Sequence, residues 1–223
     1  KLREKNWVMP AADCWRDIAT LRDQHRHFEF FWFPYSDSVV AKSLEDTDED
    51  VAAPVTTEQM FQRGERVSSD QRAFKIGCDI ARFVPMLSKR LQKFFTNASA
   101  GASSRARWSH EIFPSARNVR FNEMEYAVPA ANGIDCIREV AEAIVTKRIP
   151  GVFPLEFRFV KGDDIWLSPF YKREAATISV HQYHRQPYAP LFDAVEPIFK
   201  RYGGRPHWGK LHSLKFAELE RLY

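Results

Sequence analysis

A short segment near residues 153–160 carries apolar and charged side chains in strict alternation, and this pattern constrains the fold most strongly. Four apolar side chains share one side of the segment: Phe153, Leu155, Phe157 and Phe159. Glu156 and Arg158 point to the opposite side, about 7 Å apart at the strand rise of ~3.3 Å per residue. The segment is therefore predicted to be a strand that buries one face and presents an acid and a guanidinium on the other.

A second strand is predicted over residues 177–183, where Ile178 and Val180 alternate with polar side chains. Only a turn and irregular residues separate it from the first strand. Two successive strands without an intervening helix favour an α+β fold with an antiparallel sheet and helices on one face, over a doubly wound parallel sheet. If the two strands pair, His181 lies on the same sheet face as Glu156 and Arg158, whereas His184 has the apolar parity or lies beyond the strand. A surface ion pair and a half-exposed histidine remain the simpler alternative.

The rest of the chain alternates between strand and helix patterns. Strands are predicted at 27–33, 38–44 and 121–129, and helices at 72–95, 134–145 and 188–202. Pro85 is expected to break the first helix, and Gly203 with Gly204 to end the last. Residues 53–69 are expected to be irregular, and the small polar residues 97–104 to form a loop.

Charge and cysteine content narrow the function classes. The formal net charge is +4 with a pI near 9.0, but Lys and Arg are scattered among acids, so no nucleic-acid partner is expected. No apolar run approaches the ~20 residues that span a bilayer. Three widely spaced cysteines, Cys14, Cys78 and Cys136, predict neither a disulfide framework nor a zinc site and favour a reducing, cytoplasmic location, with membrane association as the alternative.

Residues 203–212 read Gly-Gly-Arg-Pro-His-Trp-Gly-Lys-Leu-His and fit no regular element. His207 and His212 lack a third ligand in a metal-binding pattern, so the spacing predicts no metal site. An ordered loop of this kind could hold Lys210 where its ammonium donates to a developing anion. Alternatively, Lys210 caps the carbonyls at the end of the preceding helix.

Gly203–Lys210 resembles the C-terminal signature of the aldonolactone oxidases, a family within the vanillyl-alcohol-oxidase class of flavoproteins that includes L-gulonolactone, D-arabinonolactone and alditol oxidases. Glu156-Phe157-Arg158, followed by Trp166-Leu167-Ser168-Pro169, looks like the Glu-x-Arg active-site block of the family. Two further segments are similar to family blocks in the expected order: Glu123–Pro129 and His27–Tyr35. The resemblance covers about residue 20 to the end of the chain.

The resemblance implies the ferredoxin-like cap, or substrate domain, of a two-domain FAD oxidoreductase. Residues 1–20 would be a linker from an FAD-binding domain, residues 21–202 the substrate domain, and residues 203–223 a segment that returns to the flavin. FAD would be held mainly by that other domain, on an N-terminal part or on a separate chain. The reaction would be oxidation of a sugar-acid 1,4-lactone by hydride transfer to flavin N5. The alternatives are a polyol oxidase or a non-catalytic ferredoxin-like interaction module.

The resemblance also implies roles for individual residues. Glu156, Arg158 and Lys210 would be catalytic: Arg158 would hold the substrate oxygen and stabilise negative charge, and Glu156 would position Arg158 and bind substrate hydroxyls. Lys210 would stabilise the flavin or substrate anion, and His181 would hydrogen-bond substrate. His207 and Trp208 would lie by the cofactor or only shape their loop. The group that removes the hydroxyl proton is left open.

Overall fold

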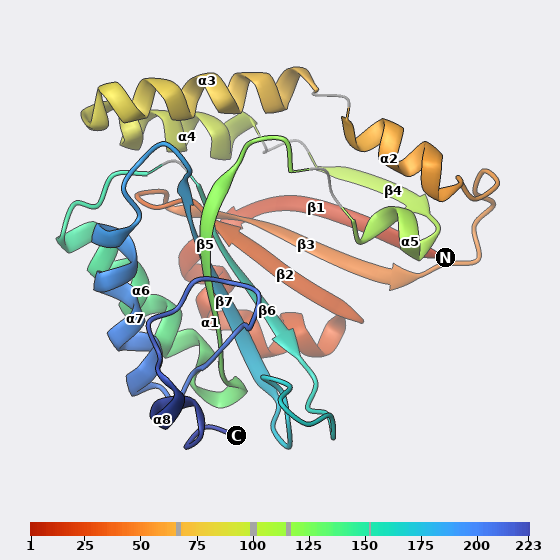
Figure 1. The fold of residues 1–223 in the computed structure, drawn as a ribbon. Helices are drawn as coiled ribbons and strands as arrows, with labels where there is room; N and C mark the ends of the chain where they lie inside the picture. Colours follow the sequence, from red (N-terminus) through yellow and green to blue (C-terminus); the bar gives the residue numbers. More distant parts are fainter. Residues whose placement is uncertain (66–67, 99–101, 115–116, 152) are drawn as a thin grey trace.

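One antiparallel sheet organises residues 1–65, 68–98, 102–114, 117–151 and 153–223, which the computed structural model describes (Figure 1). Its eight strands follow the order β4-β1-β3-β2-β6-β7-β5-β8, and the paired strands run antiparallel. The strands are β1 Leu2–Pro10, β2 His27–Trp32, β3 Ser38–Asp46, β4 Ser103–Arg107, β5 Phe121–Pro129, β6 Leu155–Val160, β7 Ala175–Tyr183 and β8 Arg205–Pro206. The predicted α+β class with an antiparallel sheet is confirmed.

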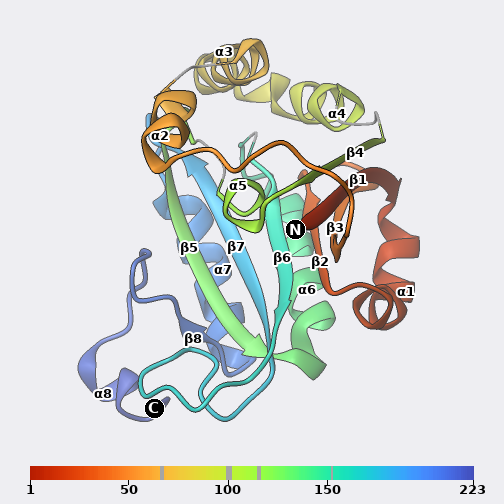
Figure 2. The ribbon, with the colours of Figure 1, turned by 90° about the vertical axis from the view of Figure 1, so that its right-hand side faces the viewer.

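Three helices cover one face of the sheet and enclose the main core. They are α1 Ala11–Gln24, α6 Gly133–Thr146 and α7 Ala189–Arg201. Phe30 of β2 and Phe157 of β6 stack 4.8 Å apart at the centre of this core, and both are fully buried. Figure 2 shows α6 and α7 behind the strands. The strand parity that the sequence predicted for Leu155 and Phe157 thus places them under these helices.

A helical hairpin lies against one end of the opposite face. It consists of α3 Ser69–Phe83, the short 3₁₀ turn Pro85–Leu87 and α4 Ser88–Ala98, so the predicted break at Pro85 is confirmed. Ser68 begins α3 with a reciprocal capping box to Gln71, in which each side chain accepts the other's backbone N–H. The remaining helices are short: α2 Thr57–Glu65, the 3₁₀ turn Ala130–Asn132, α5 Ser109–Ile112 and α8 Phe216–Leu219.

The expectation that residues 1–20 form a linker is wrong. Leu2–Pro10 pairs with β3 along its whole length, from Leu2 opposite Asp46 to Pro10 opposite Ser38, and the following residues enter α1. The polar stretch at Glu4–Asn6 hides this strand from a hydrophobic-periodicity search, because strand pairing and not side-chain apolarity holds it.

Two predicted irregular stretches also contain regular structure. Residues 57–65 form α2 inside the segment expected to be irregular, and Ser103 begins β4 inside the expected loop 97–104. Residues 99–101 of that loop, and residues 66–67 of the first stretch, lie outside the described residues.

Phe153 does not share the core face predicted for it. The strand β6 begins at Leu155, so the alternation is broken at Pro154. Phe153 instead packs under α3 in a second apolar cluster with Cys78 and Tyr183. This cluster closes one end of the polar sheet face.

The chain reverses sharply after α7. Gly203 has a φ of 69°, a left-handed conformation that favours glycine. Its N–H donates to the Lys200 carbonyl at 3.0 Å and that of Gly204 to the Phe199 carbonyl at 2.9 Å, so the helix ends where the sequence predicts. The reversal directs β8 back along the outer edge of β5. Among the described residues, no helix has the length and apolarity required to cross a bilayer.

Candidate functional site

The sheet face opposite α1, α6 and α7 carries charged side chains whose neighbours are set by strand register. Glu156 of β6 lies opposite Ser179 of β7, which lies opposite Glu125 of β5. Two residues further along β6, Arg158 lies opposite Glu29 of β2. Each of these residues has the outward parity of its strand, so the antiparallel register assembles them side by side.

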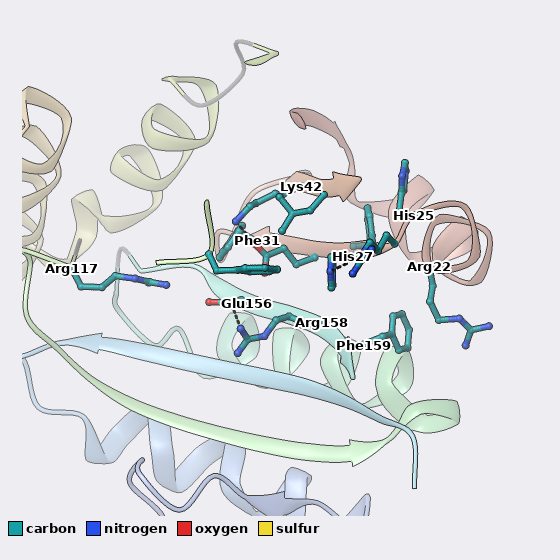
Figure 3. A pocket seen from close by; sticks show the side chains of 14 residues that line it. Arg22, His25, His27, Phe31, Lys42, Arg117, Glu156, Arg158 and Phe159 are labelled. Atoms are coloured by element: carbon teal, nitrogen blue, oxygen red, sulfur yellow. Dashed lines mark hydrogen bonds and ion pairs between the residues drawn. The ribbon is translucent and has the colours of Figure 1, made fainter. Parts of the chain in front are cut away.

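Arg158 lies between two buried carboxylates. Its NH1 is 3.3 Å from Glu156 Oε1 and its NH2 is 3.4 Å from Glu125 Oε1. The guanidinium also donates from Nε to Thr177 Oγ1 at 3.3 Å, and Ser179 Oγ donates to Glu125 at 2.8 Å. Figure 3 shows the Glu156–Arg158 ion pair within the site. The predicted pair is therefore not a solvated surface contact, because both carboxylate side chains are less than a tenth exposed.

Burial and charge oppose each other at this pair. Burial raises the pKa of Glu156, and the neighbouring Arg158 only partly offsets it. Burial acts to lower the pKa of Arg158, but Glu156, Glu125 and further carboxylates outweigh burial and raise it. The guanidinium thus stays charged and provides a positioned cation on a polar, partly desolvated surface.

Two adjoining cavities open beside Glu156. The larger, about 250 Å³, is charged, and the other, about 230 Å³, is bordered by aromatic rings and His181. Glu156, Phe31 and Arg117 line both. Polar side chains that line the larger cavity include Arg22, His25, His27, Glu29, Lys42 and Arg158 (Figure 3). A ligand with several hydrogen-bonding groups could therefore meet both donors and acceptors here.

His181 lies on the predicted face. Its Nδ1 is 2.9 Å from the carbonyl of Pro154 and its Nε2 is 3.4 Å from Glu123 Oε1. His184 follows the end of β7 and is exposed, so the choice of His181 over His184 agrees with the structure. His181 lies beside the Arg158 cluster because Glu123, its partner across the β5–β7 pairing, is two residues from Glu125.

Lys210 returns to the same face from the end of the chain. The backbone N–H of His207 donates to the Glu125 carbonyl, and that of Leu211 to the Glu123 carbonyl, each at 2.9 Å. These two bonds fasten the loop along β5, and the Lys210 ammonium pairs with the Glu123 carboxylate. The structure thus places Lys210 at the sheet and not at the end of α7, which disagrees with the capping alternative.

His207 and Trp208 shape the loop that carries Lys210. His207 Nδ1 accepts from the Gly209 N–H at 3.0 Å. Trp208 does not hold the loop through a buried ring, because the residue is 45% exposed. Trp208 is instead held by a 2.6 Å hydrogen bond from Nε1 to the Leu167 carbonyl and by contact with the Tyr223 ring.

Four charged residues of the face were not assigned roles from the sequence: Glu29, Lys42, Glu123 and Glu125. Lys42 pairs with Glu29 at 2.7 Å, next to Arg158. Burial raises the pKa of Glu123, but the hydrogen bond from His181 and the charge of Lys210 lower it to about 2. The alternation of Glu123 and Glu125 with Met124 and Tyr126 is the signal that could have indicated them.

Comparison with known proteins gives concordant relatives. The family model for D-arabinono-1,4-lactone oxidase matches residues 1–223. The L-gulono-1,4-lactone dehydrogenase of Mycobacterium tuberculosis (strain ATCC 25618 / H37Rv) is 36% identical over 201 residues, which cover 90% of this chain and 46% of that protein. The L-gulonolactone oxidase of Bos taurus is 27% identical over 205 residues, covering 88% of this chain and 45% of the oxidase. This chain therefore spans about half the length of these relatives.

A solved structure shares the fold. The solvent-stable cholesterol oxidase superposes with a TM-score of 0.69 at 15% identity, over 93% of this chain and 49% of that one. Such identity supports the architecture alone, whereas the family match extends over every residue of the chain. The chain belongs to the D-arabinono-1,4-lactone oxidase family.

Proposed function

We propose that this chain is the substrate-binding part of an FAD-linked oxidoreductase that oxidises a CH–OH group of a sugar-acid lactone. The observation that carries the proposal is Arg158, a guanidinium held between the buried carboxylates Glu125 and Glu156 at the wall of a polar cavity. The names of the relatives, L-gulono-1,4-lactone dehydrogenase and L-gulonolactone oxidase, support the same chemistry.

The larger cavity suits a small ligand rich in hydroxyl groups. It is lined by two carboxylates, Glu29 and Glu156, which pair with Lys42 and Arg158. Three further cations also line it: Arg22, Arg26 and Arg117. Carboxylates accept hydrogen bonds from hydroxyl groups, and the cations donate to hydroxyl or carbonyl oxygens. A lactone offers both kinds of group, so it can bind to the donors and to the acceptors of this cavity.

Four residues of the sheet face have assigned roles in this proposal. Arg158 binds and orients the substrate oxygen and favours negative charge that develops on it. Glu156 accepts from a substrate hydroxyl and holds Arg158 in place. His181 and Lys210 supply further donors at the β5 side of the face. Exclusion of water by the aromatic side chains of the neighbouring cavity strengthens these interactions.

A flavin ring fits this donor set. Two cations, Arg158 and Lys210, lie on one sheet face, and such groups suit a ring that gains negative charge on reduction. FAD bound against this face would supply the hydride acceptor for oxidation of the carbinol carbon. The chain has no G-x-G-x-x-G phosphate-binding sequence, so we infer that a partner region, on the same or another polypeptide, holds most of the cofactor.

The test is flavin reduction by sugar lactones in the chain completed with an FAD-binding region. Arg158→Ala is expected to slow reduction more than ~100-fold, as when a preorganised charge donor is removed. Arg158→Lys is expected to rescue poorly, because an ammonium does not reproduce the guanidinium fork. Parent-like reduction by Arg158→Ala would remove Arg158 from the site. Faster reduction by open-chain alditols than by lactones would support the polyol alternative, and no reduction by either would favour an interaction module.

A further inference from the structure

The carboxylate of Glu123 gives one oxygen to each of two basic side chains. Its Oε1 lies 3.4 Å from Nε2 of His181, and its Oε2 pairs with Nζ of Lys210. The side chains of Glu123 and His181 are only 14% and 4% exposed, so water competes weakly for these contacts. The three groups form one charge network, two residues along β5 from the Glu125–Arg158 contact.

The imidazole of His181 is fixed on several sides. Its Nδ1 is 2.9 Å from the carbonyl oxygen of Pro154, which can only accept, so Nδ1 carries a proton. The ring of Phe121 meets the imidazole edge-on at 5.0 Å. Nε2 of the imidazole faces the Glu123 carboxylate, 3.4 Å away. The imidazole is therefore held in one orientation between the Pro154 carbonyl and the Glu123 carboxylate.

The loop that carries Lys210 is attached to β5 by its backbone, independently of the Glu123 carboxylate. The Leu211 N–H donates to the Glu123 carbonyl at 2.9 Å, and the Lys210 N–H donates to the His207 carbonyl at 3.0 Å. The backbone hydrogen bonds fix the position of the loop, whereas the carboxylate fixes the position of the Lys210 ammonium group. A substitution limited to the side chain can test this role without removing the loop.

We propose that Glu123 is a positioning residue that holds the Lys210 ammonium and the His181 imidazole on the reacting face of the sheet. The inference rests on the function proposed above for these two groups. Glu123 acts through Lys210 and His181 and has no role of its own in the reaction.

The first test uses the chain itself and needs neither flavin nor substrate. Competitive acetylation, followed by mass spectrometry, measures the reactivity of Lys210 relative to the exposed Lys147. Glu123→Gln is expected to raise the relative reactivity of Lys210 at least ~3-fold, because loss of the ion pair frees a side chain that is only 27% exposed in the parent. The matched control is Glu139→Gln, which breaks an ion pair with Arg201 elsewhere on the molecule and is expected to leave Lys210 unchanged.

Unchanged Lys210 reactivity in Glu123→Gln would overturn the proposal. Should that variant fail to fold, Glu123→Asp draws the carboxylate back by one methylene and provides the same readout. Increased Lys210 reactivity in the aspartate variant supports the proposal, and parent-like reactivity overturns it.

The second test uses the completed enzyme and a double-mutant cycle. Glu123→Gln is expected to slow flavin reduction at saturating lactone ~10-fold or more while changing KM less than ~3-fold. The double variant Glu123→Gln with Lys210→Met is expected to be slower than Lys210→Met alone by less than the full effect of Glu123→Gln, because coupled residues are not additive. The remaining effect is the part that Glu123 exerts through His181. Additive losses would show that Glu123 acts independently and would refute the proposal. If none of the lactones reduces the flavin of the parent enzyme, the proposed function fails. The acetylation result still decides whether Glu123 positions Lys210.

Discussion

Replacement of Arg158 by Met tests whether one guanidinium keeps two buried carboxylates in place. Arg158 is within 3.4 Å of Glu125 and 3.3 Å of Glu156, whose side chains are 6% and 7% exposed. Methionine keeps much of the aliphatic volume and removes the charge. The variant therefore leaves two carboxylates close together on a desolvated surface with less compensation.

The expected loss of stability is about 2–3 kcal/mol at pH 8. Removal of one partner from a fully buried ion pair costs about 3–5 kcal/mol. Arg158 is itself 40% exposed, so water already screens part of its attraction and the value falls below that range. Ser179 continues to donate to Glu125 at 2.8 Å, which limits the loss further.

The loss is expected to be smaller at pH 5. Burial raises the pKa of Glu156 and Arg158 opposes that effect, so the folded-state pKa rises further in Arg158→Met. A raised carboxyl pKa means that the folded state binds protons more tightly than the unfolded state. Its stability is then greatest below the unfolded pKa and falls as the pH rises through the folded pKa. Each added unit of pKa widens the difference between the two pH values by up to about 1.4 kcal/mol.

Urea unfolding of parent and variant at pH 5 and pH 8, followed by circular dichroism, measures both quantities. Arg105→Met is the matched control, because Arg105 pairs with the buried Glu4 but is 58% exposed and Glu4 also faces Lys42. We expect the control to lose less than about 1 kcal/mol at either pH. An equal loss for Arg158→Met at both pH values would refute the coupling between Arg158 and the two carboxylates.

Three further outcomes are expected. The free energy of unfolding of Lys210→Met should lie within about 1 kcal/mol of the parent value, since the ion pair of Lys210 is partly exposed. The same variant should slow flavin reduction in the completed enzyme ~10-fold or more, and early melting with parent-like reduction would exclude Lys210 from the site. Gly133→Ala should cost about 1–3 kcal/mol in urea unfolding, because an added Cβ lies 2.5 Å from Ala176 Cβ and 3.1 Å from Phe157 Cζ, whereas Gly209→Ala meets only a side-chain contact at 3.3 Å. The chain without a partner region should retain no stoichiometric FAD after desalting, as judged by visible absorbance.

Local patterns in the sequence indicated much of the sheet and part of the site. Alternation placed Leu155 and Phe157 in the core and Glu156 and Arg158 on the opposite face, and the structure agrees. The same reasoning placed His181 correctly. These features are predictable because the side-chain direction along a strand depends only on the strand's own two-residue period.

Helix ends were predictable for a similar reason. Pro85 and the Gly203–Gly204 pair end helices through the backbone geometry of the residues themselves. Their effect therefore does not depend on contacts with distant segments. The strand at Leu2–Pro10 was not predictable in this way. Its polar sequence carries little periodic signal, and it is a strand because β3 and β4 pair with its two edges.

The charge network around Glu123 was decided by the tertiary structure. Sequence alternation can put Glu123 on one face of β5, but only the β5–β7 register brings it opposite His181. The loop after Gly203 meets it only because the chain reverses and pairs along β5, which joins Lys210 to a residue 87 positions earlier. Side-chain period is a local property of the backbone, whereas register and chain reversal depend on contacts between distant segments, and so the neighbours of each charge follow from the fold alone.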